Sequence, residues 1–260
     1  MNDLERAQAA AVLHEAEQTG APIEPVTHKY PALTVDDAYQ IQLINVRKRV
    51  SSGSVVKGHK VGLTSRAMQK TLGVNEPDYG HLLDDMFQDD GASVRIERFL
   101  QPRVEVEIAF RLRTPLAGPG VSVDDVLAAT KSVAPSIEII DSRIADWTIT
   151  LADTIADNAS SAGVIVGPWH AVDEMPALET IVADLVKNNQ VVASGIGADV
   201  LGHPATAVAW LANRLSALGV QLEAGHVVMP GSCTKAVDVT AGDEVRADFG
   251  ELGTASVRFV

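Results

Sequence analysis

Residues 100–110 constrain the fold more than any other stretch of this chain. They spell LQPRVEVEIAF, in which apolar residues alternate with acidic ones after the proline. Successive side chains of a strand point to opposite faces, so Glu105 and Glu107 share one face while the valines and the isoleucine around them share the other. The alternation therefore predicts a strand with one face in the core and two like charges on the opposite face.

Two interpretations of Glu105 and Glu107 are open at this point. Carboxylates at positions i and i+2 of a strand repel each other, and partial burial would raise their pKa values unless a cation lay between them. The pair is therefore a candidate ligand set for a hard divalent metal ion. The alternative is a half-exposed strand whose polar face lies in water. A third oxygen ligand nearby would favour the metal site.

Glu138 is the candidate third ligand. It interrupts an apolar strand predicted over 134–142, APSIEIIDS, and a charged residue there is either exposed at an edge or paired. A salt bridge with Arg143 or a nearby lysine is the alternative to a metal. Three converging carboxylates suit Mg²⁺ or Mn²⁺, and the sequence has no helical HExxH spacing that would indicate a histidine zinc site. We expect Asp141 to be a structural partner rather than a ligand.

Composition limits the kind of protein. With 46% hydrophobic and 21% charged residues, the 260-residue chain suits a soluble globular protein with a sizeable core. Its formal net charge of −13 disfavours nonspecific nucleic-acid binding. No apolar run approaches the ~20 residues that span a bilayer, and the N-terminus is acidic without a signal-peptide core, so we expect no membrane association and a cytoplasmic location. The single cysteine, Cys233, excludes an intrachain disulfide and lacks an evident base partner, so we expect it to be inert.

Periodicity and capping residues predict the order of the elements. Helices are expected over 3–19, 34–50 and 202–219, after Ser122, and over a short segment, 64–73, that carries Met68 and Leu72. Strands are expected over 55–63, 100–110, 134–142, 164–166, 179–187 and 190–194, with a turn at Asn188-Asn189 and a hairpin at the C-terminus. The sequence therefore predicts an α+β fold with a mixed sheet, in which residues 1–54 form an N-terminal helical segment and residues 55–260 a mixed-β catalytic domain.

The remaining segments are predicted as loops. These are 21–32, which holds three prolines, 75–83, and the polar segment 156–163. The loop over 75–83 is expected to place Asp78, Tyr79 and His81 together. Within the strand over 55–63, glycines 58 and 62 suggest a close approach of the backbone to another group.

Several motifs together resemble a known family. They are GHKVGLT at 58–64, EPDYG at 76–80, QPRVEVEIAF at 101–110, IEIIDSRIADW at 137–147, ADNASS at 156–161 and LGHP at 201–204. The chain resembles the 2-hydroxypenta-2,4-dienoate hydratase and 4-oxalocrotonate decarboxylase group, which is similar to the fumarylacetoacetate hydrolase superfamily. The resemblance runs in matching order from about residue 34 to the C-terminus, so it is far more specific than any single motif.

The resemblance implies a fold and a set of site residues. The fold is a mixed β-sheet roll of fumarylacetoacetate hydrolase type with a small N-terminal helical segment. The implied cofactor is a divalent metal, Mg²⁺ or Mn²⁺, held by the residues that match the family's ligands. We expect His81 and His203 to be structural hydrogen-bonding residues. The implied site comprises Glu105, Glu107 and Glu138 as metal ligands, Lys60 and Asp78 as catalytic residues, and Ser160 and Leu63 as substrate-binding residues.

The implied reaction adds water at C4 of a 2-hydroxy-2,4-dienoate to give a 4-hydroxy-2-oxo acid, in the meta-cleavage catabolism of aromatic or steroid-derived compounds. Such an enzyme is a carbon–oxygen lyase. One alternative is decarboxylation of 4-oxalocrotonate, and a second is a non-catalytic partner that stabilises such an enzyme. A hydrolase would require a water-activating His–Glu pair, and none can be assigned. The family also suggests a homo-oligomer and a complex with a pathway aldolase or decarboxylase.

Overall fold

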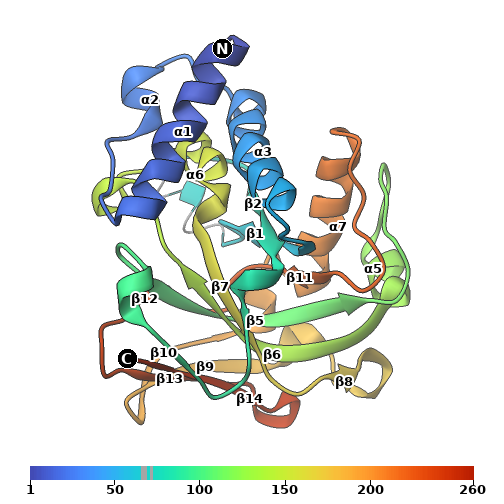
Figure 1. Ribbon diagram of the computed structural model, residues 1–260. Coiled ribbons are helices and arrows are strands. Elements are labelled where there is room, and N and C mark those ends of the chain that lie inside the picture. The colour runs from blue at the N-terminus through green and yellow to red at the C-terminus, as the bar shows by residue number, and fades with distance from the viewer. Residues whose placement is uncertain (66–68, 71–72) are drawn as a thin grey trace.

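The computed structural model describes residues 1–65, 69–70 and 73–260 (Figure 1). The predicted short helix over 64–73 carries Met68 and Leu72, which lie outside the described residues. The described α-helices are α1 (Asp3–Thr19), α2 (Val26–Lys29), α3 (Val35–Ser51), α5 (Val123–Ala129), α6 (Leu151–Ala156) and α7 (Pro204–Ser216).

The capping residues named in the sequence begin their helices as predicted. Thr34 accepts a hydrogen bond from the backbone of Asp37 at the start of α3, and Ser122 does the same with Asp125 at the start of α5. Two short helices were not predicted. The segment 21–32 contains α2, and α6 ends at Ala156, where a polar loop was expected to begin.

Two mixed sheets make up the rest of the fold, which confirms the α+β prediction. The larger sheet has the order β2-β1-β11-β5-β6-β7-β3, with β12 paired to β5 and β8 paired to β6. The smaller has the order β10-β9-β13-β14-β4 and lies below it in Figure 1. The strands of the larger sheet are β1 (Val56–Gly62), β2 (Asp78–Leu83), β3 (Phe87–Gln88), β5 (Arg103–Leu112), β6 (Thr130–Ile140), β7 (Ser161–Val166), β8 (His170–Ala171), β11 (Val227–Met229) and β12 (Val237–Asp238). Those of the smaller are β4 (Ala92–Val94), β9 (Val182–Lys187), β10 (Gln190–Ile196), β13 (Glu244–Asp248) and β14 (Thr254–Phe259).

The predicted turns of the smaller sheet are present. Asn188 and Asn189 join β9 to β10 with φ values of 52° and 63°, which asparagine tolerates better than most residues. The C-terminal strands β13 and β14 pair antiparallel, as expected for a hairpin. Strand β9 begins at Val182 rather than at 179, because a short 3₁₀ turn covers Leu178–Thr180.

The segment predicted as a loop over 75–83 is largely strand β2, so that prediction was wrong. It pairs antiparallel with β1, with Lys60 opposite Gly80 and His59 opposite His81. Alternation along β2 then places Asp78 on the same face as Lys60 and His81 on the other face. Asp78 and His81 are therefore separated by the sheet instead of gathered in one loop.

Close backbone approach explains the glycines of β1. A Cβ at Gly58 would lie 1.8 Å from the carbonyl oxygen of Val227, and a Cβ at Gly62 would lie 2.2 Å from Oδ1 of Asp78. Any larger side chain would clash at either place. Gly62 in particular leaves the space in which Asp78 lies beside β1.

The helices lie over one side of the larger sheet (Figure 1). Helix α1 packs on α3, and α3 packs on α6, while α5 packs on α7. Among the described residues, no helix is long and apolar enough to cross a membrane.

Candidate active site

The register of β5 and β6 brings three glutamates together. Glu105 lies directly opposite Glu138 in the antiparallel ladder, and Glu107 follows two residues along β5 on the same face. One carboxylate oxygen from each glutamate lies within 4.8 Å of the others. Glu107 and Glu138 are 0% exposed, which excludes the interpretation of a polar strand face in water.

These carboxylates have the properties of cation ligands. Both oxygens of Glu138 and Oε1 of Glu107 have no hydrogen-bond partner among the described residues, whereas Oε2 of Glu107 accepts a hydrogen bond from the backbone of Gly231 at 2.8 Å. Burial raises the pKa of Glu138 to about 7, and burial together with Glu138 raises the pKa of Glu107. Buried, unpaired carboxylate oxygens on converging side chains fit a hard divalent cation.

Lys60 provides a positive charge beside this cluster. Its ammonium donates a hydrogen bond to the carbonyl oxygen of Ala159 at 3.0 Å and lies 3.6 Å from Oε1 of Glu138. Burial favours the neutral amine, but Glu138 and Asp78 outweigh it and raise the pKa of Lys60. The predicted lysine partner of Glu138 is therefore present, and the charge of Lys60 is kept inside the protein.

Asp78 lies on the same face and has one carboxylate oxygen available. Oδ2 accepts a hydrogen bond from the hydroxyl of Thr154 at 2.9 Å, while Oδ1 is buried without a partner among the described residues. Thr154 belongs to α6, which Thr150 and Asp153 begin through a capping box. The sequence pattern Thr-x-x-Asp at 150–153 could have indicated this helix, and with it Thr154.

The turn between α6 and β7 brings Ser160 to the same place. Asn158, Ala159 and Ser160 have φ values of 52°, 51° and 54°, which non-glycine residues rarely adopt. The Ser160 hydroxyl is buried and has no hydrogen-bond partner among the described residues. Strained backbone of this kind persists where the surrounding structure fixes it and is frequent at functional sites.

A pair of buried charges holds this turn. Arg143 donates to the carboxylate of Asp157 and to the carbonyl oxygen of Asp141. The carboxylate of Asp141 accepts hydrogen bonds from the backbone N–H groups of Leu100 and Gln101, so its expected structural role is confirmed. Because Arg143 pairs with Asp157, it is not the partner of Glu138.

A cavity of about 190 Å³ lies between Lys60, Asp78 and Ser160 and is lined by all three. Its polar lining includes Lys60, Asp78, Glu105 and Ser160, and its apolar lining includes Leu63, Ile140 and Ile149. The predicted residues that line it are therefore Lys60, Leu63, Asp78, Glu105 and Ser160, while Glu107 and Glu138 are buried beside Glu105. The remaining lining residues that sequence analysis did not assign to the site are Gly62, Arg103, Trp147, Thr154, Ala159 and Ala236.

The other polar residues singled out in the sequence lie outside this cavity. Nδ1 of His81 lies 2.8 Å from Oε1 of Gln42, and Nδ1 of His203 accepts a hydrogen bond from the backbone of Ala205 at the start of α7. Both histidines therefore have the structural roles expected of them. Burial raises the pKa of Cys233, which agrees with an inert thiol.

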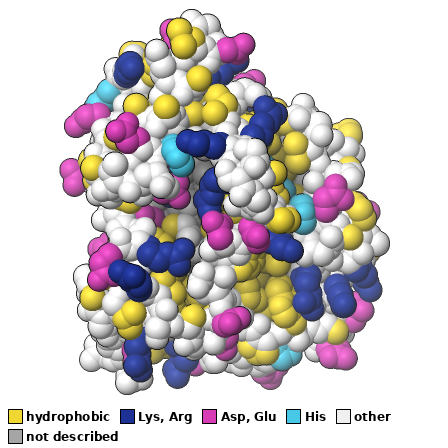
Figure 2. Space-filling model, in the orientation of Figure 1, with side chains coloured by type: hydrophobic (Ala, Val, Ile, Leu, Met, Phe, Trp, Pro, Cys, Tyr) yellow, Lys and Arg dark blue, Asp and Glu magenta, His cyan; other side chains and the backbone are white. Residues whose placement is uncertain are grey.

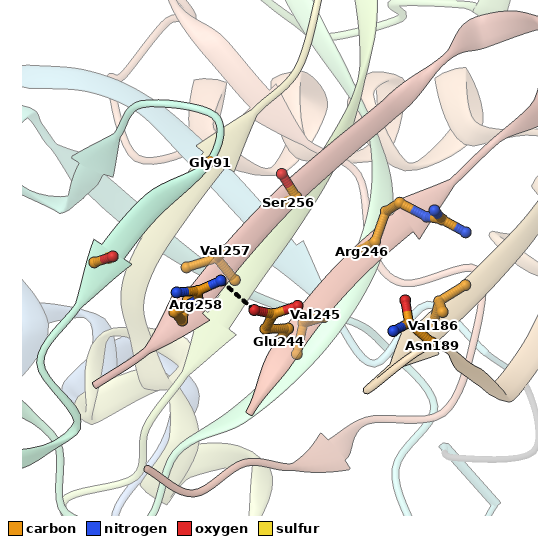
Figure 3. A pocket seen from close by; sticks show the side chains of 10 residues that line it. Gly91, Val186, Asn189, Glu244, Val245, Arg246, Ser256, Val257 and Arg258 are labelled. Carbon is orange, nitrogen blue, oxygen red and sulfur yellow. Dashed lines mark hydrogen bonds and ion pairs between the residues drawn. The ribbon is translucent and has the colours of Figure 1, made fainter. Parts of the chain in front are cut away.

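A second hollow lies on the smaller sheet and shares no residue with the glutamate cluster (Figure 3). Its volume is about 480 Å³, and Glu244 pairs with Arg258 across neighbouring strands in it. Exposed ion pairs of this kind stabilise little and mark no site by themselves. The smaller cavity at Lys60 is therefore the candidate active site.

Comparison with known proteins agrees with this geometry. A family model described as fumarylacetoacetate (FAA) hydrolase C-terminal matches residues 51–260. The chain is 45% identical over 249 residues to a 2-hydroxyhexa-2,4-dienoate hydratase of Comamonas testosteroni. The aligned segment covers 95% of this chain and 94% of that protein. It is 43% identical over 254 residues to a 2-oxo-hept-4-ene-1,7-dioate hydratase of Escherichia coli, covering 95% of each.

A solved structure has nearly the same fold. The 4-oxalocrotonate decarboxylase of Pseudomonas putida G7, complexed with magnesium and adipate, has a TM-score of 0.96 and 37% identity, over 100% of this chain and 99% of that one. The relatives named as hydratases are carbon–oxygen lyases. Because the family model covers residues 51–260 and the similarity to these relatives extends over nearly the whole chain, this chain belongs to the fumarylacetoacetate hydrolase family.

Proposed function

We propose that this protein is a divalent-metal-dependent hydratase that adds water to a 2-hydroxy-2,4-dienoate and forms a 4-hydroxy-2-oxo acid, in meta-cleavage catabolism of aromatic or steroid-derived compounds. The observation that carries the proposal is the group of three glutamates beside Lys60 and an adjoining cavity, in which buried oxygens of Glu107 and Glu138 have no hydrogen-bond partner among the described residues. The names of the hydratase relatives supply the substrate class.

Each site residue has a role in this proposal. Glu105, Glu107 and Glu138 would hold Mg²⁺ or Mn²⁺, and when bound the cation would supply Lewis acidity toward the 2-oxygen end of the substrate. Lys60 stabilises the negative charge that develops there while a proton moves from oxygen to carbon. Ser160 donates its free hydroxyl hydrogen to the substrate carboxylate.

Asp78 moves protons in this proposal. Thr154 holds Oδ2 of Asp78, so that Oδ1 is the atom available for proton transfer. Leu63 forms part of the cavity wall and contacts the substrate there. The conjugated ketone that results from the proton transfer accepts water at C4, and the carboxylate is retained.

An isotope experiment tests the reaction. The purified protein with Mg²⁺ and 2-hydroxypenta-2,4-dienoate in H₂¹⁸O should give 4-hydroxy-2-oxopentanoate with the label in its 4-hydroxyl group. The loss of dienoate absorbance should proceed without release of CO₂. Turnover by the protein purified alone would exclude the alternative of a non-catalytic partner.

The second candidate function is decarboxylation of 4-oxalocrotonate. The observation in its favour is the high structural similarity to a 4-oxalocrotonate decarboxylase. A similar ligand set serves both reactions, because charge develops at the 2-oxygen in each. Rapid CO₂ release from 2-oxo-hex-3-enedioate, without hydration of a monocarboxylic dienoate, would assign the protein to this branch.

The organisation of the whole protein also remains a proposal. We propose that residues 1–54 are a helical segment attached to a catalytic domain over 55–260, which the start of the family match at residue 51 supports. A homo-oligomer is supported by hydrophobic side chains that gather below the centre of the face in Figure 2. The cytoplasmic location and a complex with a pathway aldolase or decarboxylase stay predictions from the sequence.

A further inference from the structure

Arg103 lies where the active-site cavity opens to a larger groove. It lines the cavity of about 190 Å³ and also the neighbouring open hollow of about 570 Å³, and Trp147 lines both with it. Arg103 and Glu105 share one face of β5, so their Cα atoms are about 6.8 Å apart along the strand. A substrate held at the glutamate cluster therefore has its far end near Arg103.

The guanidinium of Arg103 is held in one orientation. Its Cζ lies 4.6 Å from the centroid of the Trp147 ring, and its Nε donates a hydrogen bond to Asp238 at 2.8 Å. Among the described residues, Nε is the only side-chain atom of Arg103 that donates a hydrogen bond. Because an arginine fork can bind a carboxylate through its two terminal nitrogens, Arg103 keeps its carboxylate-binding groups available.

Trp147 is held in a strained position under this guanidinium. Asp146 and Trp147 have φ values of 55° and 54°, a region that bulky residues rarely occupy. The indole Nε1 donates to the carbonyl oxygen of Gln101 at 3.2 Å, which fixes the ring. An exposed Arg–Asp pair stabilises little and would not need an aromatic platform of this kind. Such strain is frequent at ligand clamps.

Two cationic side chains line the cavity. Lys60 lies beside Glu138, and Arg103 is the other cationic residue among the described residues that line the cavity. The same wall also includes the apolar side chains of Ile140 and Ile149, next to the polar residues already named. This arrangement suits a chain with an anionic group at each end and carbon between them.

We propose that Arg103, supported by Trp147, binds a second carboxylate at the far end of the substrate, so that the preferred substrates are dicarboxylic 2-hydroxydienoates rather than monocarboxylic ones. The proposal rests on the proposed function for the end of the substrate that is held at the glutamates. Asp238 orients the guanidinium through Nε and lies mostly in solvent, since its side chain is 81% exposed.

Binding and turnover measured separately test the proposal. In the presence of Mg²⁺, calorimetry should show that the wild-type protein binds adipate more tightly than hexanoate by at least ~10-fold, the usual strength of hydrogen bonds to charged groups. Arg103→Met keeps the stem of the side chain and should remove this preference. Arg103→Lys should retain part of it, because it keeps the charge without the fork. Arg246→Met, at an exposed arginine of β13, is the matched control and should keep the wild-type preference.

The same variants are then assayed with 2-hydroxyhexa-2,4-dienoate and 2-hydroxyhepta-2,4-diene-1,7-dioate. The wild type should have the higher kcat/KM with the dicarboxylate, and Arg103→Met should lower the ratio of the two values by ~10 to 100-fold, mainly through KM. Equal binding of adipate and hexanoate by the wild type, or an equal loss for both ligands in Arg103→Met, would overturn the proposal. Absence of hydration of either dienoate, with the adipate preference intact and dependent on Arg103, would overturn the proposed function and leave Arg103 as the binding residue for a second carboxylate.

Discussion

The two faces of strands β1 and β2 both bury polar side chains, but they do so in different ways. One face carries Lys60 and Asp78 beside a cavity, and the other carries His59 and His81 beneath helix α3. All four residues are less than 6% exposed. Burial of a polar group alone therefore does not distinguish an active site from a core.

The difference lies in which groups keep their charge. The carboxylates around Lys60 raise its pKa, so that face holds a buried ion. On the other face, burial lowers the pKa of His81 to about 4 and lowers that of His59 as well, so both rings are neutral near pH 7. On these two strands, the buried charges lie next to the cavity, and the buried groups on the other face are neutral.

The largest effect is expected from the glutamates of β5 and β6, which lie beside Lys60 on the charged face. Glu107→Gln should weaken Mg²⁺ binding and lower kcat/KM by ~10³-fold, because it removes charge from the centre of the site. Stability of the metal-free protein should not fall, since a buried unpaired charge is removed. Calorimetric titration with Mg²⁺, steady-state rates and urea unfolding measure the three quantities.

Glu97→Gln is the control for this experiment, because Glu97 is an exposed glutamate. It should have wild-type metal affinity and activity. Unchanged Mg²⁺ affinity in Glu107→Gln, Glu105→Gln and Glu138→Gln alike would show that the cation binds elsewhere.

The next effect concerns the positive charge on the same face. Lys60→Met keeps most of the side-chain volume and should lower kcat by ~10²-fold, as expected when a desolvated charge is lost from a reaction site. Lys57→Met is the matched control, since Lys57 lies on the same strand and is exposed. Circular dichroism distinguishes a folded, inactive variant from an unfolded one. A folded Lys60→Met protein with normal turnover would contradict the role proposed for this face.

The neutral face should respond to acid instead. His81 has a pKa of about 4 when folded and an ordinary value near 6.5 when unfolded, so the unfolded chain binds more protons between these values. Stability that is fully present above pH 6.5 is therefore lost as the pH falls toward 4, by about 2 kcal/mol between pH 7.5 and 5. Urea unfolding at the two pH values should show that the wild type loses more stability than His81→Gln over this interval, by about 2 kcal/mol. The comparison is needed because Glu138, whose pKa is raised to about 7, changes stability in the opposite direction in both proteins. A variant with the same pH dependence as the wild type would mean that His81 does not titrate on unfolding.

The sequence was sufficient for most of the fold, because alternation and capping are local signals. It predicted β5 from the alternation over 100–110 and α3 from the helical pattern over 34–50. It missed β2 because the turn-forming residues of 75–83 resemble a loop, whereas pairing with β1 decides their conformation. Tertiary contact overrode local propensity at the place where Asp78 enters the site.

The same limit applies to the candidate site. Charged residues that interrupt apolar strands, such as Glu107 and Glu138, are visible in a sequence. The carbonyl oxygen of Ala159 and the hydroxyl of Thr154 are not, because only folding brings them to Lys60 and Asp78. Sequence patterns therefore indicate the charged groups of a site better than the neutral groups that position them.

The smallest expected effect tests one of these neutral groups. Thr154 donates a hydrogen bond to Oδ2 of Asp78 at 2.9 Å and is 2% exposed. Thr154→Val has nearly the same shape without the donor, so Asp78 should lose its fixed orientation. Because a net hydrogen bond contributes about 1 kcal/mol, kcat should fall by ~5 to 10-fold with little change in KM.

Thr154→Ser provides the decisive control, because it restores the hydroxyl but lacks the methyl group. Recovery of kcat in Thr154→Ser would assign the effect to the hydrogen bond and make Thr154 a positioning residue for Asp78. If kcat were as low in Thr154→Ser as in Thr154→Val, the methyl group and the packing of α6 would be responsible for the effect. The difference between the two faces would then rest on the charged residues alone. If neither variant differed from the wild type, Asp78 would need no support from α6, and its orientation would be set by β1 and β2.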